Sequence, residues 1–355
     1  MTKKVYINSV GSVSAQKTFD NSDFLEDVVY YNENVITVID PNYKDYIPPA
    51  AARRMAKGIK MSTVSSRTAL DEAGLEDVDA IMVGTGLGCI GDSAKFVGDI
   101  IDNNEQFLTP TRFIQSSHNT VSGQIALAIG CTGYNFTYVN ASVSFESCLI
   151  DALLQLRTDE AKNVLVGGVD EIADHHVRSH QLIHHIKNAP VDAKKLLESD
   201  TKGCVTAEGA NFFVLSDKKQ ASTYAELVAV KSFNTLSEAR LEPVLKNFLS
   251  ENGLTIEDVD MVVLGNNGDV DFDSYYNILS EGAFKHTSQL YYKHLSGEFD
   301  TASSFGFWLG AKILKSQAIP QAVKLNTIEP ANLKTIVLYN QYRGENHTLT
   351  LLRQC

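Results

Sequence analysis

The stretch that decides the fold runs from Gly133 to Ala152 and reads GYNFTYVNASVSFESCLIDA. Its first part, around Phe136 to Val139, is aromatic and β-branched, which predicts a strand. From Val143 onward apolar residues recur three or four positions apart, which predicts a helix. Ser142 lies in the turn between the two. A side chain there meets exposed backbone N–H groups and the positive end of a helix dipole, so Ser142 is expected to be either an N-cap or a nucleophile.

Composition narrows the class of protein. The chain has 355 residues, of which 44% are hydrophobic and 21% charged, as in ordinary soluble globular proteins. The net charge of -12 argues against a nucleic-acid-binding protein, which would carry a basic stripe. No apolar run is long enough for a signal peptide or a membrane span, so we expect a cytoplasmic protein. The five cysteines are widely spaced without a metal-binding pattern, which predicts free thiols.

Strands and helices alternate along the chain, which predicts a layered α/β architecture. In the first part we expect strands at 5–13, 79–84, 136–139, 162–167 and 212–215, helices at 50–74, 92–103 and 122–129, and a turn at 109–113. A second round begins near Tyr224, with strands expected at 227–231, 261–264, 322–325, 336–339 and 348–352 and helices at 237–250, 274–283 and 304–315. The similar order hints at an internal duplication into halves 1–220 and 221–355. Because no flexible linker separates them, the halves should share one core.

Three other patterns are weighed as sites. The glycine-rich loop 84–88 lacks the spacing of a nucleotide-binding motif. His176, His180 and His184, in the histidine cluster at 175–185, would share one helix face, but no glutamate occupies the place that a zinc-protease motif requires. The alternating acids of 269–273 resemble a calcium loop without its final glutamate, which favours a solvated turn. No metal or cofactor is expected.

Several fragments, in their order along nearly the whole chain, resemble the β-ketoacyl synthases of the thiolase fold. They are residues 5–14 (VYINSVGSVS), 53–55 (RRM), 110–113 (PTRF), 117–120 (SHNT), 133–135 (GYN), 167–171 (GGVDE) and 207–210 (AEGA). The resemblance implies two duplicated α/β halves stacked as α-β-α-β-α. It also implies a chemistry in which an acyl chain moves from an acyl carrier protein to a cysteine. A malonyl unit is then decarboxylated and attacks the thioester, while two histidines and backbone N–H groups stabilise the enolate and oxyanion.

At the catalytic positions this chain departs from the family. The family's cysteine falls on Ser142, whose hydroxyl needs an adjacent general base to become a nucleophile. The first histidine falls within LGNNGD at 264–269, where Gly265 or Asn267 takes its place.

The second histidine normally ends a Lys-x-x-x-Gly-His run. Here Lys293 is retained and Glu298 replaces the histidine, although an ionised carboxylate only accepts hydrogen bonds and would repel an enolate. The sequence NQYRG at 340–344 replaces a glycine-rich gating loop and puts Tyr342 where a phenylalanine controls admission of the extender unit.

These changes together resemble a chain-length factor, the inactive partner of an active ketosynthase in type II polyketide and aryl-polyene systems. The resemblance implies a heterodimer, or else a homodimer, that shapes the tunnel for a growing chain and works with an acyl carrier protein. Ser142 departs from the glutamine usual in aromatic polyketide systems and is expected to act as an N-cap rather than in catalysis. Tyr342 and Phe113 are expected to contact substrate.

Two alternatives stay open at this point. One is an active acyltransferase or hydrolase of the same fold that uses Ser142 with Glu298 as base. The other is a homodimeric acyl-binding scaffold, which would need an apolar cavity beside Ser142.

Overall fold

The computed structural model describes residues 3–330 and 332–355, and their strands form two halves with the same topology. The first half consists of β1 (Tyr6–Val13), β4 (Ala80–Gly84), β5 (Tyr134–Tyr138), β6 (Asn163–Asp170) and β9 (Gly209–Ser216). The second consists of β10 (Ala225–Asn234), β11 (Met261–Leu264), β12 (Ser288–Tyr291), β13 (Thr335–Tyr342) and β14 (Asn346–Arg353). When the five strands of each half are numbered in chain order, they lie side by side in the order 3-2-4-5-1. In both halves the fifth strand is antiparallel to both of its neighbours. The predicted duplication is therefore confirmed, whereas the boundary at 220/221 stays a prediction.

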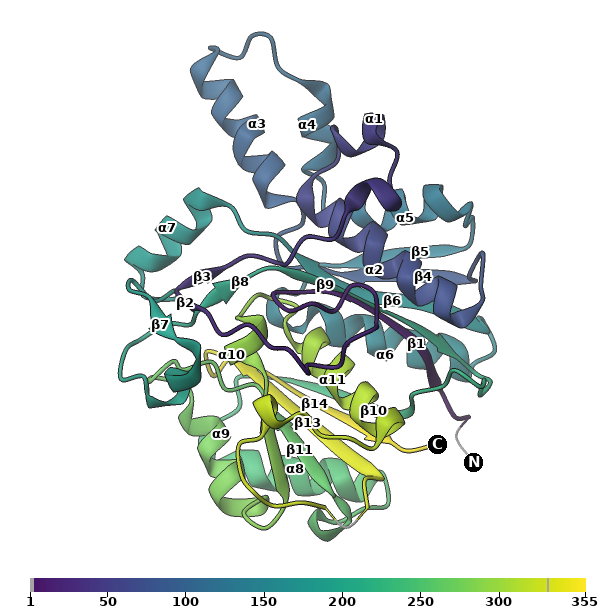
Figure 1. The fold of residues 1–355 in the computed structure, drawn as a ribbon, viewed down its shortest axis with the longest axis vertical. Helices are drawn as coiled ribbons and strands as arrows, with labels where there is room; N and C mark the ends of the chain where they lie inside the picture. Colours follow the sequence, from purple (N-terminus) through teal and green to yellow (C-terminus); the bar gives the residue numbers. More distant parts are fainter. Residues whose placement is uncertain (1–2, 331) are drawn as a thin grey trace.

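Two helices lie between the halves and form the central layer (Figure 1). Helix α6 (Ser144–Arg157) packs on β4 and β6 and also reaches β10, while α11 (Ser303–Ser316) packs on β13 and also reaches β1 and β9. Twelve consecutive residues of α11 are buried, as expected of a helix enclosed on all sides.

Outer helices complete the layers. On the first half they are α2 (Lys57–Ala73) and α5 (Thr120–Ile129), and on the second half α8 (Glu238–Glu251) and α9 (Ser274–Ile278). The order α-β-α-β-α predicted for the thiolase fold is thus observed (Figure 1).

Some predicted elements are wrong. Residues 322–325 do not form a strand, because Gln321–Val323 is a 3-10 turn (η6) that follows Pro320. Just after this turn the chain covers the edge of β12, where the Leu325 N–H donates to the Gln289 carbonyl. Residues 109–113 are not a turn but lead into helix α4 (Pro110–Gln115), whose first position accepts proline because its N–H has no intrahelical partner.

The helix predicted at 50–74 is split into α1 (Pro49–Ala52) and α2. The predicted C-cap is confirmed, since Gly74 has a left-handed φ of 67°.

A hairpin of α3 (Ile90–Asp102) and α4 extends away from the layered body (Figure 1). The remaining short elements are α7 (Asp174–Leu182), α10 (Lys293–Ser296), β2 (Asn32–Glu33), β3 (Val35–Ile36), β7 (Val191–Asp192), β8 (Thr206–Ala207) and the short helices η1 (Tyr43–Asp45), η2 (Ala141–Val143), η3 (Ala193–Glu198), η4 (Ile256–Asp258) and η5 (Leu279–Ala283). Among the described residues, no helix has the length and apolar character needed to cross a membrane. The five cysteines are free thiols, as predicted.

Candidate functional site

Ser142 lies between β5 and α6, inside the 3-10 turn η2, and is 3% exposed. The preceding residue, Ala141, has a φ of 46°, a left-handed conformation that strains a residue with a Cβ atom. The predicted N-cap role of Ser142 is wrong, because the extra 3-10 turn moves the cap position of α6 to Val143, which makes no side-chain cap bond. The strained strand-to-helix turn is present, but the Ser142 hydroxyl does not cap the helix.

The Ser142 hydroxyl instead helps to connect the start of helix α6 to strand β14 of the other half. Asn346 Nδ2 donates to Ser142 Oγ at 3.1 Å, and one turn further along the helix Thr348 Oγ1 donates to Glu146 Oε1 at 3.1 Å. Glu146 is 2% exposed, and this burial raises the pKa of its carboxyl group. Among the described residues, the hydrogen-bond partner of the Ser142 side chain is therefore an amide donor and not a general base.

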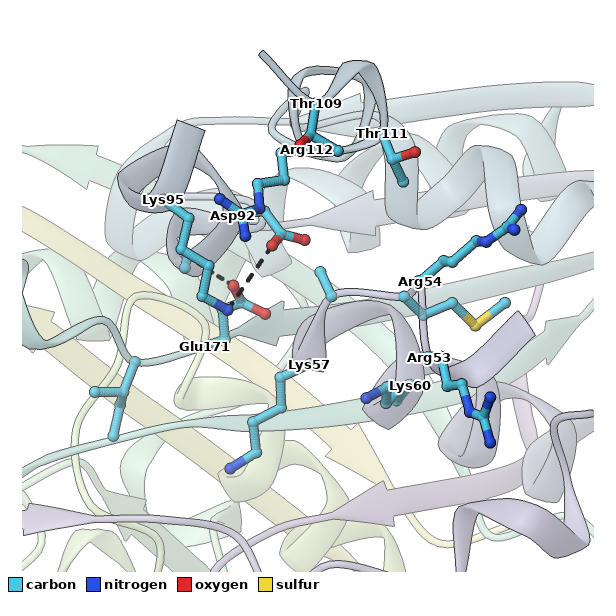
Figure 2. Close-up of a pocket in the computed structure, with 14 residues that line it drawn as sticks. Arg53, Arg54, Lys57, Lys60, Asp92, Lys95, Thr109, Thr111, Arg112 and Glu171 are labelled. Atoms are coloured by element: carbon cyan, nitrogen blue, oxygen red, sulfur yellow. Dashed lines mark hydrogen bonds and ion pairs between the residues drawn. The ribbon is translucent and has the colours of Figure 1, made fainter. Parts of the chain in front are cut away.

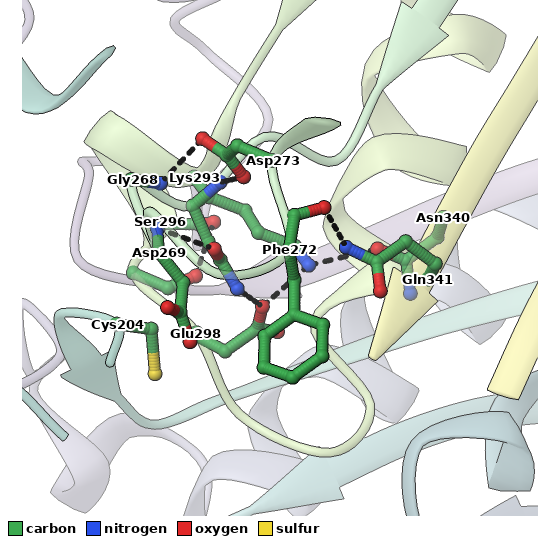
Figure 3. A network of polar contacts seen from close by, with 12 residues as sticks. Cys204, Gly268, Asp269, Phe272, Asp273, Lys293, Ser296, Glu298, Asn340 and Gln341 are labelled. Atoms are coloured by element: carbon green, nitrogen blue, oxygen red, sulfur yellow. Dashed lines mark hydrogen bonds and ion pairs between the residues drawn. The ribbon is translucent and has the colours of Figure 1, made fainter. Parts of the chain in front are cut away.

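A second cluster forms where the family's two histidines are expected, and Figure 3 shows it at close range. Lys293 Nζ lies 2.6 Å from Glu298 Oε2, and the two side chains are 1% and 5% exposed. Asn267 Nδ2 donates to the same Glu298 oxygen at 2.7 Å, and Lys293 Nζ donates to Asn340 Oδ1 at 2.7 Å. The structure therefore brings the predicted positions 267, 293 and 298 together, and it is Asn267 rather than Gly265 that contacts position 298.

The loop that carries Asn267 is held by its own acids. Asp273 accepts the N–H groups of Asn267 and Gly268 at 3.2 and 2.9 Å, and burial raises its pKa to about 6. Asp269 is buried and faces the guanidinium of Arg343 at 3.5 Å. The solvated turn expected here is wrong for these two acids, because both organise the loop from inside.

The two predicted substrate contacts, Tyr342 and Phe113, lie in different surroundings. Tyr342 borders a cavity of about 60 Å³ together with Glu298 and Asp300, and burial raises the pKa of its hydroxyl. Phe113 is 62% exposed on α4, where its ring packs 5.4 Å from that of Phe96. Within one chain, the structure does not bring Phe113 to the predicted catalytic positions.

The glycine-rich loop after β4 binds a carboxylate of the chain itself. Asp170 accepts the N–H groups of Gly86 and Leu87 at 2.8 and 3.3 Å and the Thr85 hydroxyl at 3.0 Å. It also accepts the Thr301 N–H and hydroxyl at 2.9 and 2.8 Å. The N–H groups that a phosphate would require at this loop are thus used internally.

The histidine cluster differs from the predicted helix face. Helix α7 ends at Leu182, so His184 lies in an exposed turn and His185 instead approaches His180, with ring centroids 5.2 Å apart. The rings of His176 and His180 are 3.9 Å apart. Across residues 3–330 and 332–355, no group of three or more histidine, cysteine or acidic side chains has a geometry suited to a metal ion.

A basic groove of about 690 Å³ lies between α2 and the α3–α4 hairpin (Figure 2). Its cationic side chains are Arg53, Arg54, Lys57, Lys60, Lys95 and Arg112. Lys57 pairs with Glu208 and Arg112 with Asp99. Arg53, Arg54 and Lys60 have no ion-pair partner in the described part of the chain. In the sequence, the signal of this groove is the excess of basic residues at 53–60, whereas its other cations come from the separate segment 95–112.

Comparisons with known proteins place this site in a family. A family model for the beta-ketoacyl synthase N-terminal domain matches residues 14–221. The chloroplastic 3-oxoacyl-[acyl-carrier-protein] synthase I of Hordeum vulgare is 24% identical over 191 residues, which cover 50% of this chain and 41% of that protein. Nodulation protein E of Rhizobium sp. (strain N33) is 28% identical over 156 residues, which cover 41% of this chain and 38% of that protein. This chain therefore spans about two fifths of the length of these curated relatives.

Solved structures extend the likeness over the whole chain at the level of the fold. The ishigamide ketosynthase/chain length factor has a TM-score of 0.82 at 14% identity, with 100% of both chains covered. The complex of the ketosynthase ApeO with its chain length factor ApeC from Xenorhabdus doucetiae has a TM-score of 0.78 at 15% identity, with 99% of this chain and 98% of that chain covered. Because the beta-ketoacyl synthase family model matches more than half of this chain, the chain belongs to the β-ketoacyl synthase family.

Proposed function

We propose that this chain is a chain-length-factor-like subunit, which does not carry out condensation alone and pairs with an active β-ketoacyl synthase. The observation that carries the proposal is the buried pair between Lys293 and Glu298, with Asn267 as a further donor to the same carboxylate. A site that stabilises an enolate must present hydrogen-bond donors to it. Here the donors are bound to an internal acceptor, and the acceptor itself carries negative charge.

Ser142 supports the same proposal. A serine hydroxyl becomes a nucleophile when a base removes its proton, whereas Ser142 Oγ accepts a hydrogen bond from Asn346. Glu298, the base of the alternative hydrolase hypothesis, is bound to Lys293 and Asn267 and shares no hydrogen bond with Ser142 among the described residues. We therefore favour the non-catalytic function over an acyltransferase or hydrolase that uses Ser142 with Glu298.

The cavities near these residues also weigh against an acyl-binding scaffold. The cavity beside Glu146 measures about 10 Å³ and the one beside Glu298 about 60 Å³. Sites for small organic ligands commonly measure about 300–1,000 Å³. A tunnel for a growing chain is better placed in the partner subunit or between the subunits.

The partner is proposed to pair along β5, which is the edge strand of the first half. Tyr134 and Phe136 on this strand are 42% and 45% exposed, and Leu154 on the adjoining helix α6 is 61% exposed. An apolar edge strand with unpaired N–H and C=O groups is a template for a second sheet. One solved relative is a ketosynthase in complex with its chain length factor, which fits a partner of the same fold. Phe113, which is 62% exposed on its own chain, would then contact the growing chain in the partner.

The basic groove is proposed to receive the acyl carrier protein. Arg53, Arg54 and Lys60, which form no ion pair with the described residues, offer positive charge to an acidic surface, although the chain as a whole has a net charge of -12. A solved relative is a ketosynthase bound to an acyl-carrier protein, and this supports the same kind of partner here.

The test is reconstitution with an active ketosynthase from the same organism, a carrier protein and malonyl units. We expect no condensation by this chain alone and product formation by the co-purified pair, with Ser142→Ala in this chain leaving the product yield unchanged. Condensation by this chain alone, or loss of product in the Ser142→Ala pair, would refute the proposal.

The proposed surfaces are tested by charge substitutions with matched controls. Phe136→Asp should abolish co-purification, whereas Val270→Asp, at another apolar residue that is 49% exposed, should not. The double variant Arg53→Glu/Arg54→Glu should weaken carrier-protein binding by about tenfold or more while pairing persists. An equal loss after charge reversal of the exposed residues Arg240 and Lys285 would refute the groove as the docking site.

A further inference from the structure

Lys187 is a buried lysine whose ammonium group is held by neutral oxygen atoms. It is 1% exposed and forms no ion pair with the described residues, although lysine is almost never fully buried unless it is paired. Four oxygens converge on its Nζ: Ser199 Oγ, the Thr201 carbonyl and Thr201 Oγ1 at 2.9 Å each, and the Gly268 carbonyl at 2.8 Å. Two of these are carbonyl oxygens that can only accept, so the group that they surround must be a donor.

The backbone of Lys187 is fixed, which makes its side chain a tether of defined length. The Lys187 N–H donates to the Cys204 carbonyl at 3.0 Å, and the Lys187 carbonyl accepts from Asn34 Nδ2 at 2.6 Å. Ser199 and Thr201 belong to the segment between η3 and β8 in the first half, whereas Gly268 follows β11 in the second half. The tether therefore connects the two halves, and neither pairing nor carrier-protein docking explains it.

Gly268 transmits this contact to the cluster around Glu298. Its carbonyl accepts from Lys187, and its N–H donates to Asp273 Oδ2 at 2.9 Å, so an ammonium group and a carboxyl group hold its two sides (Figure 3 shows the contact with Asp273). Gly268 has a φ of 76°, a conformation that favours glycine. The preceding residue, Asn267, donates to Glu298 Oε2 at 2.7 Å. A displaced Gly268 carbonyl would thus move Asn267 away from Glu298.

We propose that Ser199, Thr201 and Gly268 form a binding site for a primary ammonium group, that Lys187 occupies this site, and that the tether positions Asn267 against Glu298. A primary ammonium group directs three N–H donors to different sides, whereas the guanidinium group of arginine has its donors in one plane. Lys187 acts through Gly268 and is therefore a positioning residue. The proposal concerns the folded chain alone and does not depend on the proposed function.

A cation added in solution can approach this site along an open groove of about 890 Å³. Ser199 and Thr201 border the groove together with His184 and Asn188. The variant Lys187→Ala lacks the side-chain atoms from Cγ to Nζ, which together correspond to n-propylammonium. This cation should therefore occupy the site in the variant and restore the contacts of the missing ammonium group.

The experiment is urea unfolding of the full chain with n-propylammonium chloride, compared with 1-propanol and tetramethylammonium chloride at equal concentration. Lys187→Ala should unfold at lower urea than the wild type, and n-propylammonium should raise its midpoint in a saturable way. Neither 1-propanol, which is uncharged, nor tetramethylammonium, which has no N–H donor, should do so. Lys187→Met fills the space without donors, so n-propylammonium should not restore it.

The matched control is Lys312→Ala. Lys312 is also buried, at 9% exposed, but among the described residues its ammonium group has one hydrogen-bond acceptor, the Asn21 carbonyl at 3.4 Å. Loss of its side chain should destabilise the chain, and n-propylammonium should not restore the midpoint, because no set of oxygens converges on the vacated position.

A second measurement reads the position of Asn267 directly. In a chain with ¹⁵N-labelled asparagine, the side-chain amide protons of Asn267 should exchange with water about tenfold faster or more in Lys187→Met, because their hydrogen bond to Glu298 is loosened. In Lys187→Ala, n-propylammonium should slow this exchange again. The Asn252 amide, which donates to the Phe248 carbonyl at the end of α8, is the control and should exchange as in the wild type.

Three results would overturn the proposal: no restoration of Lys187→Ala by n-propylammonium, equal restoration by tetramethylammonium or 1-propanol, or unchanged Asn267 exchange in Lys187→Met. If Lys187→Met does not fold, the Asn267 exchange of Lys187→Ala with and without n-propylammonium decides the question. Pairing and carrier-protein docking do not enter these measurements, so their outcome is separate from that of the proposed function.

Discussion

Replacing Lys293 by methionine should be among the most destabilising single changes in this chain. Lys293 and Glu298 are 1% and 5% exposed, and their charged atoms lie 2.6 Å apart. Without Lys293, Glu298 would keep only the Asn267 amide as a side-chain donor among the described residues, and Asn340 Oδ1 would lose the ammonium group that binds it. Removing one member of a buried ion pair leaves an uncompensated charge, at a cost of about 3–5 kcal/mol.

The double variant Lys293→Met/Glu298→Gln should be less destabilised than Lys293→Met, because it leaves no buried charge and glutamine can still accept from Asn267. Urea unfolding measures both variants as a shift of the midpoint at constant slope. The control is the exposed pair of Lys246 and Glu242 on α8, whose removal should cost about 0.3–0.5 kcal/mol. A cost below about 1 kcal/mol for Lys293→Met, or a double variant worse than the single, would refute this account.

Three further predictions concern single residues. Gly86→Ala should destabilise by about 1–3 kcal/mol because its Cβ atom would overlap Asp300, whereas Gly98→Ala, in open space on α3, should stabilise by up to about 1 kcal/mol in the same urea assay. Burial lowers the pKa of His294 from 6.5 to about 4, so the unfolded chain binds a proton in this range that the folded chain does not. Stability should therefore fall by up to about 3 kcal/mol as the pH drops through this window, and His294→Gln should flatten the profile. Ser142→Ala should cost about 1 kcal/mol, measured by urea unfolding, through loss of one hydrogen bond.

The fold was predictable where local patterns are long or strongly apolar. Strand β11 has the predicted bounds Met261–Leu264, because four consecutive apolar residues mark a strand that is buried on both faces. Strand β12 was missed because Ser288 and Gln289 make half of its four residues polar. Its partner strand and the covering segment at η6 bury them, and this information lies outside the local sequence.

The site was predictable in part. Positions 267, 293 and 298 were found because motif spacing places them, and the structure joins their side chains. Asn346, which is 204 residues from Ser142, and Asp300 were missed because their contacts depend on how the two halves stack. The N-cap prediction failed by one residue, which is within the usual uncertainty of a helix start.

The proposed loss of condensation is tied to the stability of the fold, and this makes it hard to reverse one residue at a time. Glu298→His would place a histidine at the family's position but remove the carboxylate that compensates Lys293, so a buried ammonium group would be left with neutral acceptors. Protonation of that histidine would add a second positive charge beside the first. Ser142→Cys would in turn replace the hydroxyl that accepts from Asn346 with a weaker acceptor. We therefore infer that regaining the reaction would require coordinated changes at these positions, whereas any one of them would first reduce stability.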